Sequence, residues 1–276
     1  MPLITIPREM GSLGKDVAAM VGQQLGKKVI HHEIIDTLAD KMRLRKTHVV
    51  RFLDGKAGIL EKMTTDQTSL SIFTADEVLR MAANDEVGVI RGWGANHLLE
   101  PVPHVVRVRV CAPFELRVER MMERLNTTDK AAVEKEIRLS DEAIAAITRR
   151  HFDVSWKETE HYDLVLNTDR VSVENCAAQV MKLASSAQFA ESAESRKKIR
   201  DLAKVAHIRG MLRADPRTRK LNIAVDVSDD HATLSGIVET ENDLKHAAEV
   251  TATVPGIARV TNSLKEMSGA YRRFGN

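Results

Sequence analysis

The chain has 276 residues, of which 43% are hydrophobic and 29% charged, and its formal net charge is +2 at pH 7. This composition supplies enough apolar material for one large domain or two smaller ones, excludes a mainly disordered chain, and gives no support to nucleic-acid binding. With only two cysteines and no apolar run near the roughly 20 residues that cross a bilayer, we expect a cytoplasmic protein without a membrane span.

The first two thirds of the sequence alternate between short apolar strands and helices. The predicted strands are 3–6, 28–30, 87–90, 104–111 and 162–166. The predicted helices are 17–25, 33–42, 76–83, one that opens at Pro113, a long one that contains 133–147, and 173–183. This alternation is typical of an α/β fold, a parallel sheet with helices on both faces. Ligands of such sheets bind beyond the carboxyl ends of the strands.

The turn between the first strand and the first helix carries the strongest functional signal. It holds Gly11, Ser12, Leu13, Gly14, Lys15 and Asp16. Small residues let backbone N–H groups approach phosphate oxygens, the following helix adds a positive dipole, and a lysine supplies a cation. The pattern G-x-x-x-x-G-K-[ST] is incomplete, because Glu9 and Asp16 replace its first and last residues. The residues alone leave two interpretations open, a phosphate-binding loop or a tight turn before a solvated lysine.

Five further patterns occur in order along this part. They are Pro-Arg-Glu-Met-Gly-Ser-Leu-Gly-Lys at 7–15, His-Glu-Ile-Ile at 32–35, Arg-Gly-Trp-Gly-Ala-Asn at 91–96, Ala-Pro-Phe-Glu-Leu-Arg-Val-Glu-Arg at 112–120, and Phe-Asp-Val-Ser-Trp with His-Tyr-Asp-Leu-Val-Leu-Asn-Thr between 152 and 168. Together they resemble the cytidylate kinase-like family, relatives of bacterial cytidylate kinase among the P-loop nucleoside monophosphate kinases. The resemblance covers residues 3 to about 183 and implies a P-loop NTPase sheet, ATP with Mg²⁺, and CMP or dCMP as the acceptor.

The resemblance also implies roles for individual residues. Residues 11–16 of the loop would hold ATP. Lys15 and Asp141 would be catalytic, and Arg8, Arg91 and Arg117 would bind the acceptor. No metal site built by the chain's own side chains is expected.

Two positions depart from the family pattern. Trp93 stands where the family has the arginine of G-R-G. Asp141 matches the first residue of a D-x-x-R motif on the family's lid helix, but Ile144 replaces its arginine. Cations that neutralise the transferred phosphoryl group are a main source of catalysis in such enzymes. A nucleotide-binding regulator without catalysis is therefore the alternative to a kinase.

The remaining sequence predicts a second, small α+β domain. Its predicted elements are a helix at 198–212, strands at 221–227 and 232–238, a helix at 241–253 and a strand at 260–264. Leu-Ser-Gly-Ile-Val at 234–238 and Val-Pro-Gly-Ile-Ala-Arg-Val at 254–260 resemble the BON domain, which implies an unidentified ligand or protein partner. We place the kinase-like domain at 1–185, a linker at 186–195, the αββαβ domain at 196–268 and a tail at 269–276. A basic stretch at 196–220 is interpreted as a solvated helix face, so a nucleic-acid partner is not expected.

Overall fold

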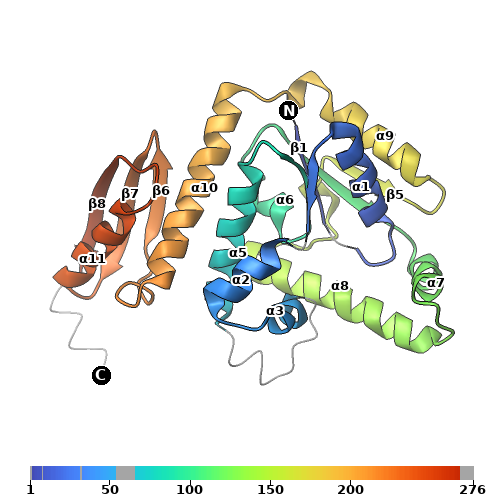
Figure 1. Ribbon diagram of the computed structural model, residues 1–276, viewed down its shortest axis with the longest axis horizontal. Helices are drawn as coiled ribbons and strands as arrows, with labels where there is room; N and C mark the ends of the chain where they lie inside the picture. Colours follow the sequence, from blue (N-terminus) through green and yellow to red (C-terminus); the bar gives the residue numbers. More distant parts are fainter. Residues whose placement is uncertain (1, 8, 32, 54–65, 268–276) are drawn as a thin grey trace.

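The computed structural model describes residues 2–7, 9–31, 33–53 and 66–267. Its larger sheet has five strands in the order β2-β3-β1-β4-β5, and every neighbouring pair is parallel (Figure 1). The strands are β1 Leu3–Ile6, β2 Lys28–Ile30, β3 Val87–Arg91, β4 Val105–Cys111 and β5 Leu164–Asn167. The predicted parallel sheet is confirmed, and each predicted strand overlaps an observed one.

Helices cover both faces of this sheet. One face carries α1 Gly14–Leu25 and α9 Val173–Ala184, and the other carries α2 Glu33–Met42, α3 Lys46–Leu53, α5 Gln67–Ala82 and α6 Ala95–Leu98. Strand side chains alternate between the two cores: Leu3 and Ile90 pack with α2 and α5, whereas Ile4 and Val89 pack with α1 and α9. Burial on both faces explains why the central strands β1 and β3 are almost entirely apolar, whereas β4 carries Arg107 and Arg109.

A helical hairpin stands apart from these layers. It consists of α7 Phe114–Leu125 and α8 Lys130–Phe152, and it has a small core of its own (Figure 1). The core residues are Val118, Met121, Val133 and Ile137. The hairpin follows β4 and returns to β5 through the short helix η1 Thr159–His161, so it lies at the carboxyl ends of the strands.

The C-terminal part is a small mixed α+β domain, as expected. It contains α10 Ala193–Ala214, β6 Ala224–Ser228, β7 His231–Val238, α11 Glu241–Ala252 and β8 Arg259–Glu266, and it follows the short helix η2 Ala187–Phe189. Strand β7 pairs antiparallel with β6 and parallel with β8. No helix among the described residues has the length and apolar character that would let it cross a membrane.

Helix α10 belongs to both parts of the molecule. It packs along α5 (Figure 1) and places Ile199 and Ala206 in the core of the first domain, whereas Ile208 and Leu212 lie in the core of the second. A polar contact reinforces this packing, because the buried carboxylate of Asp76 on α5 accepts hydrogen bonds from Lys41 and from His207 on α10. The boundaries placed at 185 and 195 stay predictions, and the tail at 269–276 lies outside the described residues.

Candidate functional site

The loop between β1 and α1 is shaped by its own hydrogen bonds. Gly11 and Leu13 have φ angles of 77° and 62°, so the backbone curls at both positions. The buried Ser12 holds this curl: its Oγ donates to the carbonyl of Glu9 at 2.8 Å and accepts from the N–H of Gly14 at 3.4 Å. The loop thus has a fixed form at the carboxyl end of the central strand.

The N–H groups at the start of α1 are partly satisfied within the loop. That of Gly14 lies 3.4 Å from Oγ of Ser12, and those of Asp16 and Val17 donate to the carbonyl of Leu13, although the side chain of the N-cap residue Leu13 makes no capping hydrogen bond. Lys15 and Asp16 are exposed in its first turn. The positive end of the helix dipole and a neighbouring ammonium group favour phosphate, and an exposed carboxylate suits a divalent cation.

Arg117 of α7 holds the loop through hydrogen bonds. Its guanidinium is buried, donates from Nε to the carbonyl of Met10 at 2.6 Å and from Nη1 to Glu9 at 3.3 Å, and binds both carboxylate oxygens of Asp141 at 2.8 and 2.9 Å. A paired, fully hydrogen-bonded guanidinium is the form in which a buried charge is tolerated. One arginine therefore ties the loop to both helices of the hairpin.

A second anchor holds the other side of the loop. The hydroxyl of Thr168, just after β5, donates to the carbonyl of Ser12 at 3.0 Å. Arg120 of α7 in turn donates to the hydroxyl and the carbonyl of Thr168 at 2.9 and 2.8 Å. The loop is thus held by α7 and by the residue that follows β5.

Glu9 is a buried acid at the start of the loop. Burial raises the pKa of this carboxyl above its ordinary value, although the charges of Arg117 and Arg109 act in the opposite direction. Its Oε2 has no hydrogen-bond partner among the described residues. A buried acid thus occupies the position at which a complete phosphate-binding pattern has glycine.

The predicted site residues fall into separate groups. The loop residues lie together with Arg117 and Asp141, and these two residues bind each other. Arg91 ends β3, the strand beside β1, and its carbonyl lies 3.3 Å from Nδ1 of His31. Arg8 lies outside the described residues.

A cavity of about 440 Å³ opens beyond the strand ends, beside the loop. Its walls come from α5, the turn at 92–94, α8 and α10. Trp93 has a φ of 63°, and its indole N–H donates to the carbonyl of His31 at 2.8 Å. Ile144 lines the same cavity. Trp93 and Ile144, the two positions that depart from the family pattern, therefore both contribute apolar surface to the walls of this cavity.

The sequence analysis did not identify the polar groups of this cavity as functional residues. Burial, with the nearby His161, lowers the pKa of His97 to about 4, and burial raises the pKa of Tyr162 to about 12, so both are neutral near pH 7. The buried amide nitrogen of Asn96 has no partner among the described residues. Asn96 and Tyr162 lie within segments that carried the family resemblance, but nothing in the pattern marks His97.

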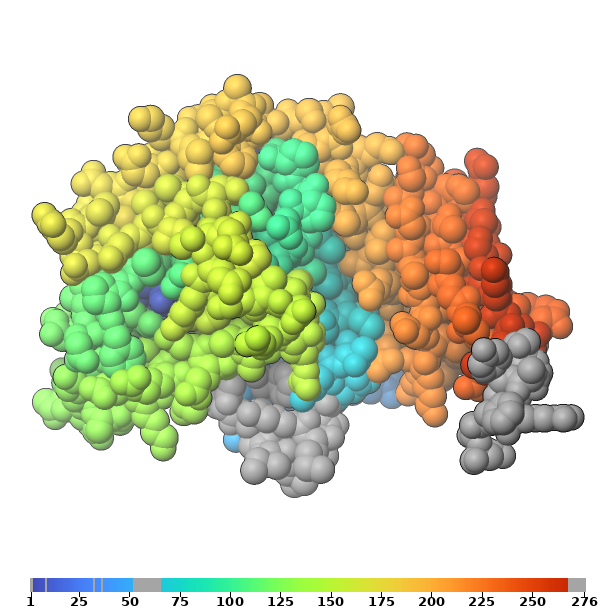
Figure 2. All heavy atoms as spheres, turned by 180° about the vertical axis from the view of Figure 1, so that it is seen from behind, coloured from blue at the N-terminus to red at the C-terminus, as the bar shows by residue number. Residues whose placement is uncertain are grey.

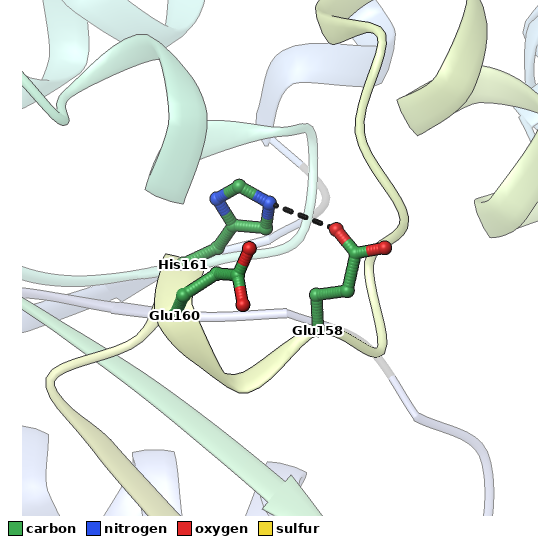
Figure 3. Close-up of side chains that lie close together, drawn as sticks. All are labelled: Glu158, Glu160 and His161. Carbon is green, nitrogen blue, oxygen red and sulfur yellow. Dashed lines mark hydrogen bonds and ion pairs between the residues drawn. The ribbon is translucent and has the colours of Figure 1, made fainter.

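A group of potential metal-ligating side chains lies on and just before η1. The ligand atoms of Glu158, Glu160 and His161 lie within 4.8 Å of one another, and Nε2 of His161 is 3.3 Å from Glu158 (Figure 3). Both glutamates are exposed, and the three residues are neighbours on one turn. Local chain geometry accounts for their proximity.

Comparisons with known proteins fit this architecture. Residues 3–170 match the model of the cytidylate kinase-like family, and residues 200–266 match that of the BON domain. No curated protein matches the chain.

Solved structures resemble the first domain. An uncharacterized protein from Eubacterium ventriosum ATCC 27560 is 20% identical, with a TM-score of 0.51 over 67% of this chain and 99% of its own. A shikimate kinase from Acinetobacter baumannii, solved with shikimate, is 14% identical, with a TM-score of 0.41 over 66% of this chain and 92% of its own. The family match spans most of the chain, so this protein belongs to the cytidylate kinase-like family, with a kinase-like P-loop fold followed by a BON domain.

Proposed function

We propose that this protein binds ATP with Mg²⁺ at residues 11–16 and transfers the γ-phosphoryl group to a nucleoside monophosphate, with CMP and dCMP as the first candidates. The observation that carries the proposal is the loop itself. It combines a fixed curl, the N-terminus of helix α1 and the exposed Lys15. These are the elements with which phosphate groups are held in P-loop proteins.

In this proposal the nucleotide is held by the backbone at the start of α1 together with Lys15 and Asp16. Backbone N–H groups at the start of α1 would hold phosphate oxygens, and Lys15 would place its charge beside them. Asp16 is exposed and offers a carboxylate, the type of ligand that Mg²⁺ prefers. Bound there, Mg²⁺ would neutralise part of the phosphate charge. Arg91 and Arg8 are proposed for the acceptor, as the family pattern implies.

A second candidate, a nucleotide-binding regulator without turnover, is favoured by a specific observation. Trp93 and Ile144 supply apolar wall where the family pattern has arginines, and Arg117 is occupied by Glu9, Met10 and Asp141. Loss of one preorganised donor costs about 2.7–4 kcal/mol of transition-state stabilisation in measured cases. Such a loss affects turnover more than ground-state binding.

The deciding experiment measures ATP binding and turnover in parallel. Calorimetry with ATP and Mg²⁺ should give binding that is at least tenfold weaker in Lys15→Ala, because the variant lacks the only lysine of the loop. Lys182→Ala, an exposed lysine on α9, is the matched control and should bind as wild type does. A coupled assay across nucleoside monophosphates then separates the two candidates.

The outcomes divide clearly. Turnover with CMP or dCMP supports the kinase, and restoration of both cations by Trp93→Arg with Ile144→Arg should increase the rate. ATP binding without turnover in either protein supports the regulator. If wild type shows no binding at millimolar ATP, both candidates fail.

A further inference from the structure

The cavity beside the loop reaches from the strand ends to the second domain. Trp93, Ile144, Ile147 and Phe152 line it from the first domain, and Leu202 and Val205 line it from α10. Figure 2 shows the segments of α8, α5 and α10 next to one another on one face of the molecule. The volume of about 440 Å³ lies within the range of small-molecule sites, roughly 300–1,000 Å³.

The walls of this cavity are mainly apolar, and Arg209 is the charged residue among them. Burial keeps His97 neutral, because it lowers the pKa of this residue to about 4. Among the polar groups of the lining, the amide nitrogen of Asn96 is buried without a hydrogen-bond partner among the described residues. A buried donor of this kind costs free energy until it finds an acceptor. The cavity therefore suits an apolar body that carries one acceptor.

A second cavity, of about 850 Å³, adjoins the first. The two share lining residues, namely Ser71, Ile72, His151 and Arg209. The second has a strongly basic lining that consists of Arg150, Arg209, Arg213, Arg219 and Lys220. An apolar chamber thus continues directly into a cationic one.

The positive charge of the second cavity is largely uncompensated. Its acidic lining residue, Asp66, is already bound by Arg213 at 2.7 Å and by the hydroxyl of Ser69 at 2.6 Å. Arg150, Arg209 and Lys220 are exposed and form no ion pair within the described part of the chain. Several unpaired cations around one concave surface favour an anionic group of a ligand.

We propose that the two adjoining cavities form one binding site for a small anionic amphiphile, with its apolar body in the first cavity and its carboxylate or phosphate group in the second. The site uses none of residues 11–16, so it is distinct from the proposed ATP site, and it shares only Trp93 and Ile144 with the positions discussed for phosphoryl transfer. The ligand contacts α5, α8 and α10 at once. Its binding therefore stabilises the packing of the second domain on the first.

Tryptophan fluorescence offers a direct readout. The chain has two tryptophans, and both, Trp93 and Trp156, line the first cavity. Titration with decyl phosphate and with decanoate should give a saturable change in emission with one site per chain and a rise in Tm. Decan-1-ol, which lacks the charge, and inorganic phosphate, which lacks the chain, should bind at least tenfold more weakly. The better of the two anions identifies the head group.

Matched variants locate the ligand. Arg150→Gln with Arg209→Gln should weaken binding of the preferred anion at least tenfold, whereas Arg149→Gln with Arg200→Gln, exposed residues on the same helices that line neither cavity, should bind as wild type does. Ala75→Phe fills the first cavity and should abolish the fluorescence change, in contrast to Ala145→Phe on the exposed face of α8. Circular dichroism and Tm verify that each variant is folded.

Three results would overturn the proposal: no saturable signal with either anion at 1 mM, unchanged affinity in the double glutamine variant, or displacement of decyl phosphate by CMP at lower concentration. The last result would mean that the cavity is built for a nucleotide. Calorimetry with ATP separates this test from the proposed function. Lys15→Ala should lose ATP binding and retain the amphiphile, and the double glutamine variant should do the opposite.

Discussion

Single residues of the loop show how closely its backbone approaches the helical hairpin. A Cβ added at Gly11 would lie 2.6 Å from the carbonyl oxygen of Arg117 and 2.9 Å from its Cβ. The φ of 77° at Gly11 is also one that other residues adopt only with strain. Glycine is required at this position for two independent reasons.

Gly11→Ala should therefore lower the free energy of unfolding by more than the backbone strain of a positive φ alone would lower it. Gly26→Ala is the matched control, because Gly26 has a φ of 62° but no atom within 4 Å of an added Cβ. We expect about 1–2 kcal/mol for the control, the usual penalty of a left-handed residue, and a larger loss for Gly11→Ala together with weaker ATP binding. Urea denaturation and calorimetry measure both quantities; equal losses in the two variants would show that the contact with Arg117 does not constrain the loop.

His97 makes the stability of the fold sensitive to acid. Its ring is stacked on Phe152 with centroids 4.8 Å apart, and burial holds its pKa at about 4, below the ordinary value of 6.5. Below about pH 6.5 the unfolded chain takes up a proton here that the folded protein does not, so stability falls as the pH drops toward 4. A single such group contributes at most about 1.4 kcal/mol per pH unit.

His97→Phe keeps an aromatic ring without a titratable group and should flatten this part of the curve of unfolding free energy against pH. His246→Phe, in α11 and remote from the cavity, should retain the wild-type slope. Urea denaturation at several pH values between 4 and 7 measures the slopes. Parallel curves for wild type and His97→Phe would show that His97 does not cause the acid sensitivity.

The residues of the loop could be predicted from the sequence, but the cavity could not, although Trp93 and Ile144 of its lining had been noted as departures from the family pattern. Glycines and a lysine between a strand and a helix are a local signal, readable within ten residues. The cavity is assembled from α5, α8, the 92–94 turn and α10, whose proximity is a property of the tertiary structure. For the same reason the sequence showed Glu9 only as a departure from a pattern and not as a buried acid with a raised pKa.

At the scale of elements, one ion pair joins the two helices α7 and α8 of the hairpin beside the loop. Arg117 and Asp141 lie on different helices and bind each other with two hydrogen bonds. The pair thus links helix α8 to the loop that the same arginine holds through Met10. Loss of the contact between Arg117 and Asp141 is therefore expected to affect both the loop and catalysis.

Asp141→Asn should separate the two effects. The amide keeps the shape but removes the charge that balances Arg117, so we expect a loss of about 1–3 kcal/mol of stability and weaker ATP binding as the loop loosens. Glu142→Gln, the exposed neighbour on α8, should change neither. Chemical denaturation, calorimetry and the coupled assay give the three readouts. A fall in turnover alone, with stability and ATP affinity intact, would instead assign Asp141 to contact with the reacting groups.

Predictability also differed among elements. The strands followed from short apolar runs, and each overlaps its prediction. The start of α5 was missed because Gln67–Ala82 opens with the polar residues Gln67, Thr68 and Ser69. The cap by Asp66, whose side chain accepts from the N–H of Ser69 at 3.1 Å, lies at this start. The start of α10 was placed too late for a similar reason, since a small polar stretch conceals the capping box of Ser192 and Ser195.

On the scale of the whole molecule, α10 connects two hydrophobic cores. Ile199 and Ala206 are buried with the first domain, and the partly buried Leu202 and Ala203 pack against the same core. Further along the helix, Ile208 lies in the second core, which also contains the fully buried Leu234 and Ala247. The second domain thus has a complete core of its own, but its first helix carries an apolar stripe that the first domain covers.

A fragment of residues 193–267 should therefore fold alone and also self-associate. Its own core is intact, so the amide NMR spectrum should be well dispersed, whereas the stripe left exposed on α10 should produce dimers or larger species in sedimentation experiments, because apolar patches of this kind are rarely left in water. Ile199→Gln with Leu202→Gln should convert the fragment to a monomer with the same dispersion. In the full chain the same pair should destabilise the protein by about 2–5 kcal/mol, since it removes buried side chains from the first core. A poorly dispersed spectrum for both fragments would instead mean that the second domain folds only on the surface of the first, and that α10 is an extension of the kinase-like core.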